Sequence, residues 1–272
     1  MSGELRNTGE RVIPEEYRDS PASYLVYLTH VATYRFCAPY VENRRVLDFG
    51  CGTGHGTAEM AAVCASVVGV DVSPQAIEYA RSRYPSPKVR YRVIPRIEVE
   101  PLPFEDHSFD VVVSIQVIEH VSEADAYLAE AKRVLRQDGV LIVATPDRST
   151  RLLPKQRPWN RFHVREFSEA ALAALLARQF RAVEVLRMSG TPDVIRGELE
   201  RTRRLKWLTL PFTFPLAPEW YRSAGLRLLS AVDRALSGRR RTGELAPWPN
   251  ERDVSIGRDL SPSINLVTVS RV

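Results

Sequence analysis

The chain has 272 residues, 44% of them hydrophobic and 26% charged, a composition typical of a globular protein with one large α/β domain. No stretch of the sequence approaches the roughly 18 consecutive apolar residues that a membrane span needs, and the polar first seven residues lack the apolar run of a signal peptide. Three widely spaced cysteines, Cys37, Cys51 and Cys64, argue against a disulfide framework, so we expect a cytoplasmic protein.

The formal net charge of +5 is unevenly placed along the chain. Between Arg187 and Asp259 there are 14 Lys/Arg and 9 Asp/Glu, whereas the two signs balance over the remaining residues. The basic excess therefore belongs to one segment. Because this excess is modest and no recognition module accompanies it, we expect no nucleic-acid partner.

Three segments are expected along the chain. Residues 1–45 are rich in aromatic side chains and form a helical lid, and residues 46–187 with 262–272 form the core. Residues 188–261 form a basic helical cap, because this stretch is rich in Arg and Pro and shows no strand alternation. Within the cap, residues 220–236 have the pattern of an amphipathic basic helix.

The core alternates short apolar runs with amphipathic stretches, as in a βαβ series that builds a parallel sheet. Ser73-Pro74 marks a helix start, because serine is a good N-cap and proline suits the first helical position. Ser168 is expected to cap a later helix. The predicted strands are 46–49, 66–70, 89–94, 109–115, 140–144, 181–186 and 264–269, and the predicted helices are 57–64, 74–83, 124–135 and 169–178.

The most informative stretch is the glycine-rich turn after the first predicted strand, with Gly50, Gly52 and Gly54. Closely spaced glycines let the backbone pass against a ligand where a Cβ atom would collide. Asp71 follows Gly50 by 21 residues at the end of the second strand, where an acid can accept hydrogen bonds from the ribose hydroxyls of an adenosine cofactor.

Two cofactor classes use this layout. A dinucleotide fingerprint requires a third glycine at position 55, where His55 stands, and Asp48 just before the turn disfavours a pyrophosphate. S-adenosylmethionine (SAM) has no phosphate and carries an ammonium group that a carboxylate can help to neutralise. SAM is therefore favoured, and an NAD-dependent oxidoreductase is the less favoured alternative.

Five motifs in register resemble the class I SAM-dependent methyltransferase family. The resemblance implies an α/β, Rossmann-like sheet of seven strands whose last strand is antiparallel, with helices on both faces. It covers residues 46–186 and the last strand. The motifs are residues 46–54, 68–73, 102–112, 119–121 and 135–141.

The same resemblance assigns the cofactor contacts. Gly50, Gly52 and Gly54 line the methionine portion of SAM, and Asp71 holds the ribose. The remaining expected cofactor residues are Asp48, Val72, Glu98 beside the adenine amine, and Gln116 near the sulfonium. The segment around Glu98 departs from the family pattern, because it lacks the usual Gly-Asp-Ala.

Methyl transfer from a sulfonium is an in-line displacement, so the protein mainly aligns the acceptor, the methyl group and the sulfur. A base is needed only for a poorly acidic hydroxyl, and histidine suits that role. His120 follows the fourth strand, in a Glu-His pair that often faces the acceptor in the family; packing or capping is the alternative. His163 belongs to a His-x-x-Glu-Phe segment similar to one in small-molecule O-methyltransferases. The similarity implies that His163 acts as the base or binds the acceptor; the alternative is that it anchors the loop.

The other histidines carry weaker expectations. We interpret His30 and His107 as bystanders. His55 is expected to border the cofactor loop and to touch the ligand without reacting. No pair of histidines and acids has zinc-ligand spacing, so we expect no metal.

A short N-terminal stretch indicates the class of acceptor. Residues 8–15 resemble an N-terminal string of methyltransferases from sugar, glycan or secondary-metabolite assembly, which favours a small-molecule hydroxyl acceptor. A SAM-binding subunit without transferase activity is the alternative. The helix at 220–236 can cover the substrate, dock on anionic lipid, or serve as a solvated face or dimer contact.

Overall fold

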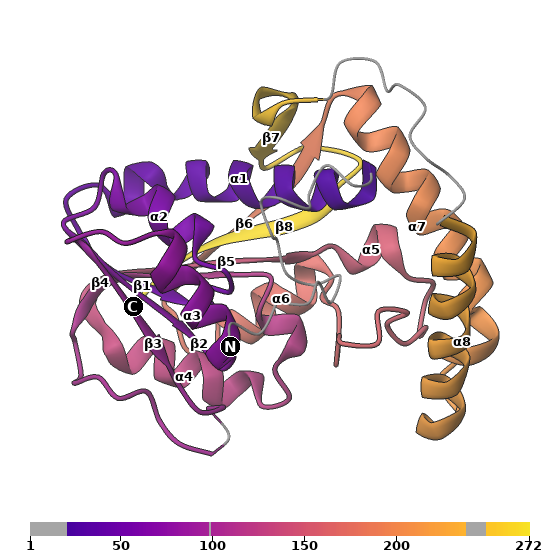
Figure 1. Cartoon of the computed structure of the whole chain (residues 1–272), viewed down its shortest axis with the longest axis horizontal. Coiled ribbons are helices and arrows are strands. Elements are labelled where there is room, and N and C mark those ends of the chain that lie inside the picture. Colours follow the sequence, from indigo (N-terminus) through magenta and orange to yellow (C-terminus); the bar gives the residue numbers. More distant parts are fainter. Residues whose placement is uncertain (1–20, 98, 238–248) are drawn as a thin grey trace.

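The computed structural model describes residues 21–97, 99–237 and 249–272. Its centre is one eight-stranded sheet in the order β3-β2-β1-β4-β5-β8-β6-β7, with helices on both faces (Figure 1). The strands are β1 (Arg45–Phe49), β2 (Ser66–Asp71), β3 (Val89–Val93), β4 (Phe109–Ile115), β5 (Leu135–Pro146), β6 (Ala182–Gly190), β7 (Val254–Gly257) and β8 (Asn265–Arg271).

The first five strands are parallel, as the alternation of apolar runs with helices predicts. β8 inserts between β5 and β6 and is antiparallel to both, so the expected antiparallel last strand is confirmed. The carboxyl ends of β1, β2 and β4 consequently meet at one edge of the sheet, where ligands bind in open α/β folds.

The expected number of seven strands is wrong by one. β7 comes from the segment that shows no strand alternation, and it pairs antiparallel with the end of β6, from Arg187–Gly257 to Gly190–Val254. A strand of only four residues offers no periodicity to detect. Its place at the edge of the sheet depends on pairing with a segment about 70 residues away in sequence.

Successive residues of the central strands serve two separate cores. On one face, Leu47 and Val112 pack with α4 (Ala124–Val134) and α6 (Glu169–Leu176). On the other face, Val46 and Val111 pack with α1 (Pro21–Val41) and α2 (His55–Ala61). This alternation explains why the strands read as continuous apolar runs, because both of their faces are buried. α3 (Pro74–Arg83) packs beside β2 and β3.

Both predicted serine caps are present. The Ser73 hydroxyl accepts from the amide of Ala76, and the Ser168 hydroxyl accepts from that of Ala171. Between β5 and α6 lie the short helix α5 (Arg148–Arg151) and a loop over residues 152–167.

The segment between β6 and β7 begins with two long helices, α7 (Pro192–Thr213) and α8 (Glu219–Ser237). They form a hairpin at the end of the molecule far from β3 (Figure 1). Within the described ranges, no helix combines the length and apolar character needed to cross a membrane.

Candidate active site

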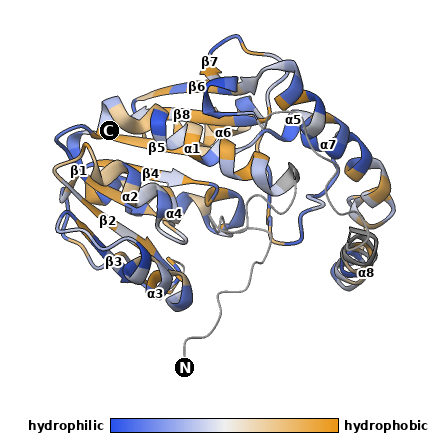
Figure 2. Ribbon diagram, turned by 45° about the horizontal axis from the view of Figure 1, so that its top comes forward, coloured by the Kyte–Doolittle hydropathy of each residue, from blue (hydrophilic) through white to orange (hydrophobic). Residues whose placement is uncertain are grey.

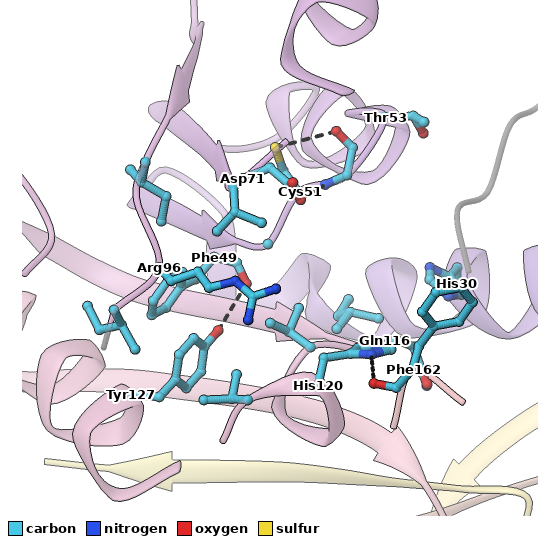
Figure 3. Close-up of a pocket in the computed structure, with 18 of the residues that line it drawn as sticks. His30, Phe49, Cys51, Thr53, Asp71, Arg96, Gln116, His120, Tyr127 and Phe162 are labelled. Atoms are coloured by element: carbon cyan, nitrogen blue, oxygen red, sulfur yellow. Dashed lines mark hydrogen bonds between the residues drawn. The ribbon is translucent and has the colours of Figure 1, made fainter. Parts of the chain in front are cut away.

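A pocket of about 410 Å³ opens at the carboxyl ends of β1, β2 and β4. Its wall brings together segments that are far apart in sequence, including the glycine-rich loop, the end of β2, the turn after β4 and one side of α1 (Figure 3). The expected site residues on this wall are Gly50, Gly52, Asp71, Val72, Gln116 and His120.

The three glycines have different environments. A Cβ atom on Gly50 would lie 2.4 Å from the Val117 side chain, so the loop can approach the β4 turn only without one. A Cβ on Gly52 would meet no protein atom within 4 Å, on a residue that lines the pocket. Gly54 is not on the wall; a Cβ there would lie 2.6 Å from Cβ of Ala80, which gives this glycine a packing role against α3.

The Asp71 carboxylate is hydrogen-bonded both to the glycine-rich loop and to the turn after β2. Its Oδ2 accepts from the Gly52 amide at 3.0 Å, and its Oδ1 accepts from the Ser73 amide at 2.8 Å. Each carboxylate oxygen has a second lone-pair direction, so the group can also accept from ligand hydroxyls. The side chain is therefore held in place before any ligand arrives.

Asp48 lies behind the glycine-rich loop instead of on the pocket wall. Its carboxyl is fully buried, with the Thr57 hydroxyl 2.6 Å and the Tyr34 hydroxyl 3.4 Å from it. Burial raises the pKa of Asp48 to about 7, and the hydrogen bonds from Thr57 and Tyr34 only partly offset this effect. Cationic charge in the pocket therefore favours ionisation of this carboxyl.

The floor of the pocket is built on Tyr127 from α4. Its ring stacks on Phe49 with 4.1 Å between centroids, and its hydroxyl donates to the Phe49 carbonyl oxygen. Gln116, on the adjacent turn, has φ of +57°, a backbone conformation that non-glycine residues rarely adopt. The backbone N–H of Gln116 donates to the Ala144 carbonyl oxygen at 2.8 Å. Residues in such conformations concentrate at ligand sites.

His120 lies on the pocket wall beside Phe162, to which it is hydrogen-bonded (Figure 3). Its Nδ1 is 3.0 Å from the Phe162 carbonyl oxygen, an atom that can only accept. Nδ1 therefore carries the hydrogen in the neutral ring, and the lone pair is on Nε2.

His163 is buried next to His120 but does not reach the pocket wall. Its Nδ1 is 2.9 Å from Oε1 of Glu166, whose Oε2 accepts from Nε of Arg151 at 3.0 Å. Although burial of Glu166 opposes ionisation, the positive charge of Arg151 and the bond to His163 hold the pKa of its carboxyl at about 2. Glu166 is thus a buried carboxylate that fixes the orientation of His163.

Comparison with known proteins decides the family. Residues 47–143 match the family model described as a methyltransferase domain. A probable SAM-dependent methyltransferase of Mycobacterium tuberculosis is 31% identical over 281 residues, an alignment that covers 98% of this chain and 89% of that protein. The chain belongs to the SAM-dependent methyltransferases. The alternative of an NAD-dependent oxidoreductase is therefore wrong.

Other relatives match parts of the methyltransferase. A probable SAM-dependent methyltransferase of Mycolicibacterium smegmatis is 37% identical over 62% of each chain. The ubiquinone biosynthesis O-methyltransferase of Pelagibacter ubique is 30% identical over 105 residues, covering 39% of this chain and 43% of that protein. Among solved structures, a possible histamine N-methyltransferase of Thermotoga maritima has a TM-score of 0.57 at 18% identity, covering 94% and 95% of the two chains; this similarity shows the fold alone.

The pocket of the methyltransferase fits SAM. The Asp71 carboxylate is prepositioned and has the lone pairs to accept from the two hydroxyls of a ribose, and Val72 lines the pocket next to it. A wall of apolar and planar groups suits the adenine ring. That wall consists of Ile94, Pro95, Arg96 and Ile97, and Glu98, the expected partner of the adenine amine, lies outside the described residues.

Two histidines lie together on the pocket wall of the methyltransferase. His30, interpreted from sequence as a bystander, lies there beside His55, the expected neighbour of the cofactor loop, with 5.9 Å between the ring centroids. Burial lowers the pKa of His30 to about 3, with a smaller contribution from His55, whose own pKa is lowered by burial to about 4. Both rings are therefore neutral at physiological pH. His107, the other expected bystander, binds the Leu135 carbonyl oxygen in a loop.

Three aromatic pocket residues are not among the expected site residues, although Tyr34 belongs to the expected aromatic lid. Tyr34, Tyr127 and Phe162 reach the wall from two helices and a loop, separated by up to 128 residues. Aromatic residues at helical spacing are ordinary core residues, so only the tertiary structure distinguishes these three.

Glu119 completes the histidine cluster. It is fully buried, its Oε2 accepts from the Thr145 hydroxyl at 3.0 Å, and its Oε1 has no hydrogen-bond partner among the residues that the structure describes. Burial raises the pKa of this carboxyl. Glu119, His120 and His163 offer ligand atoms within 4.8 Å of one another, a grouping that the spacing of these residues in the sequence did not indicate.

Proposed function

We propose that this methyltransferase transfers the methyl group to a hydroxyl of a small-molecule acceptor, with His120 as the general base. The observation that supports the proposal is the position of His120. It lies on the wall of the pocket that also contains Asp71 and Gly50, with Nδ1 bonded to a backbone carbonyl oxygen.

The hydrogen bond from Nδ1 suits His120 to accept a proton. With the ring neutral, the lone pair on Nε2 can take the proton of the acceptor hydroxyl as the new O–C bond forms. The imidazolium that results keeps its Nδ1–H donated to Phe162, so the geometry of the ring is the same before and after transfer. The proton then passes to solvent. Bound SAM supplies an electrophilic methyl group on a sulfonium, and no other activation of the donor is required.

His163 is better suited to position His120 than to react. Its ring is buried behind that of His120, and its Nδ1–H is held by the Glu166 carboxylate, which Arg151 in turn anchors. The chain Arg151–Glu166–His163 provides a fixed surface for the base, comparable to the orienting groups that support catalytic histidines elsewhere.

The acceptor class we propose is a sugar, a glycan precursor or a secondary metabolite. Support comes from the resemblance of residues 8–15, which lie outside the described residues, and from two partial relatives. The Pelagibacter ubique protein and an O-methyltransferase of Penicillium expansum, 35% identical over 38% of this chain, both have O-methyltransferase in their names. We also propose that the enzyme works in the cytoplasm, since all three cysteines are free and buried.

The test is a screen of acceptors with methyl-labelled SAM. Purified protein is incubated with panels of hydroxylated and aminated small molecules, and labelled products are identified by mass spectrometry and NMR. The proposal predicts an O-methyl ether as the product. A methyl ester, or a product methylated on nitrogen or carbon, contradicts it, and SAM binding without transfer to any member of the panels favours a SAM-binding protein without transferase activity.

A further inference from the structure

The hairpin of α7 and α8 exposes an unusual amount of apolar surface. Within the described chain, half of the exposed large hydrophobic side chains lie in 22 consecutive residues of this hairpin. Leu216 is 87% exposed and Trp220 is 74% exposed. The complete set is Trp207, Leu208, Phe214, Leu216, Trp220 and Leu228.

Both sides of α8 are apolar, although only one of them is packed. Leu226 and Gly225 are buried, and a Cβ on Gly225 would lie 2.0 Å from the ring of Phe212 on α7, so this side closes the hairpin. Trp220 and Leu228, eight residues apart and thus on the same side of the helix, face outward. The outer side of a surface helix is normally polar, so this stripe indicates a ligand surface.

The region around these side chains is basic. Residues 203–228 contain five Lys/Arg and a single acid, Glu219. Glu219 pairs with Arg157 and Arg222, so it does not neutralise the exposed arginines. Arg203, Arg204 and Arg227 are exposed beside the apolar side chains. Five cations against one acid give this region an excess of +4, in a chain whose net charge is +5.

We propose that the tip of the α7–α8 hairpin binds the surface of anionic lipid bilayers. The tip is defined here as residues 203–228. Exposed tryptophans favour the headgroup region of a bilayer, and arginines can bind anionic lipid while their stems cover apolar surface. Apolar area and electrostatic attraction together determine the strength of such interfacial contacts.

The shape of the tip favours a bilayer over a second copy of the chain. The hairpin projects from one end of the molecule (Figure 1, Figure 2). A symmetric contact between two tips would place Arg203, Arg204 and Arg227 of one copy against those of the other, a like-charge arrangement that disfavours association.

The tip is also fastened to the loop that carries the pocket residue Phe162. Nη1 of Arg157 donates to the Ala217 carbonyl oxygen at 2.9 Å, and Nη2 of Arg222 donates to the Pro158 carbonyl oxygen at 2.9 Å. Docking of the tip therefore fixes the pocket relative to the membrane surface. The inference concerns binding alone and does not depend on the proposed acceptor.

The test is sedimentation with vesicles in the absence of SAM and acceptor. Vesicles of phosphatidylcholine alone are compared with vesicles that also contain phosphatidylglycerol, at low and high salt. We expect binding only to the anionic vesicles, and we expect added salt to weaken it because salt screens the arginines.

Two double variants separate the apolar and the charged contributions. Leu216→Ser with Trp220→Ser, and Arg203→Gln with Arg204→Gln, should each lower the partition coefficient about tenfold or more. Val63→Ser and Arg90→Gln, exposed positions on other elements, are the matched controls and should bind as wild type does. Circular dichroism establishes that each variant is folded.

Three outcomes of the vesicle experiment overturn the proposal. They are no binding to anionic vesicles, equal binding to both vesicle types, and binding that neither double variant weakens. A dimer in solution that Leu216→Ser with Trp220→Ser dissociates also overturns it, because the apolar surface then belongs to a second copy.

Discussion

The imidazole of His120 packs edge-on against the imidazole of His163, with 4.9 Å between ring centroids and 86° between ring planes. The first ring faces the pocket and the second is buried behind it, bonded to Glu166. This arrangement gives the two histidines separate tasks, proton transfer for His120 and orientation for His163. A substitution of His163 or Glu166 should therefore lower turnover less than a substitution of His120.

Stability at acidic pH should depend on Glu166. The pKa of its carboxyl is about 2 in the folded chain against an ordinary value of 4.5, so the unfolded state binds its proton at higher pH. The stabilisation, of the order of 3 kcal/mol, is complete above pH 4.5 and is lost as the pH falls towards 2. Chemical denaturation of wild type and Glu166→Gln across this range measures it. If the variant keeps the wild-type slope, the stabilisation comes from another group.

SAM affinity should depend on Asp71. Asp71→Ala removes the expected acceptor of the ribose hydroxyls and also frees the amides of Gly52 and Ser73. Hydrogen bonds to a charged group are worth about 1.5–3 kcal/mol each, so we expect the calorimetric Kd for SAM to rise roughly 30-fold or more. Asp125→Ala, which removes a surface ion pair with Arg178, is the control. A Kd within twofold of wild type for Asp71→Ala contradicts the ribose assignment.

The sequence predicts the cofactor half of the pocket because its signals are local. The glycine-rich turn and Asp71 occupy fixed places after two strands, and short apolar runs mark those strands. Pocket residues that come from distant segments give no such local signal, and His30, interpreted from the sequence as a bystander, lies on the wall. β7 was missed for a related reason, because four residues become a strand only when β6 is beside them.

Two glycines of the same motif should respond differently to alanine. Gly52→Ala places a methyl group on the open side of the loop at the pocket, so SAM should bind at least about tenfold more weakly. Gly54→Ala places Cβ too close to Ala80, at a residue with φ of +82°. The free energy of unfolding should therefore fall by about 1–3 kcal/mol, and the melting temperature should fall with it.

The control for both is Gly197→Ala. In α7 an added Cβ meets no atom within 4 Å, so neither the affinity nor the melting temperature should fall. The distinction between the two loop glycines fails if Gly54→Ala melts like wild type, or if Gly52→Ala binds SAM normally.

Chelation should leave methyl transfer unchanged. Glu119, His120 and His163 lie close enough to share an ion, yet in-line displacement on a sulfonium needs alignment and not a Lewis acid. We expect full activity after dialysis against EDTA, with no gain on adding Zn²⁺ or Mg²⁺. Loss of activity that a metal restores in wild type but not in Glu119→Gln contradicts a metal-free mechanism.

The measurement that tests the central claim most directly is the turnover of His120→Gln on an identified hydroxyl acceptor, with the Kd for SAM measured in parallel. Loss of a general base typically lowers turnover 10²- to 10⁴-fold, and we predict a fall in this range with the Kd for SAM within about twofold of wild type. Full turnover in His120→Gln, with normal SAM binding, contradicts the assignment of His120 as the base.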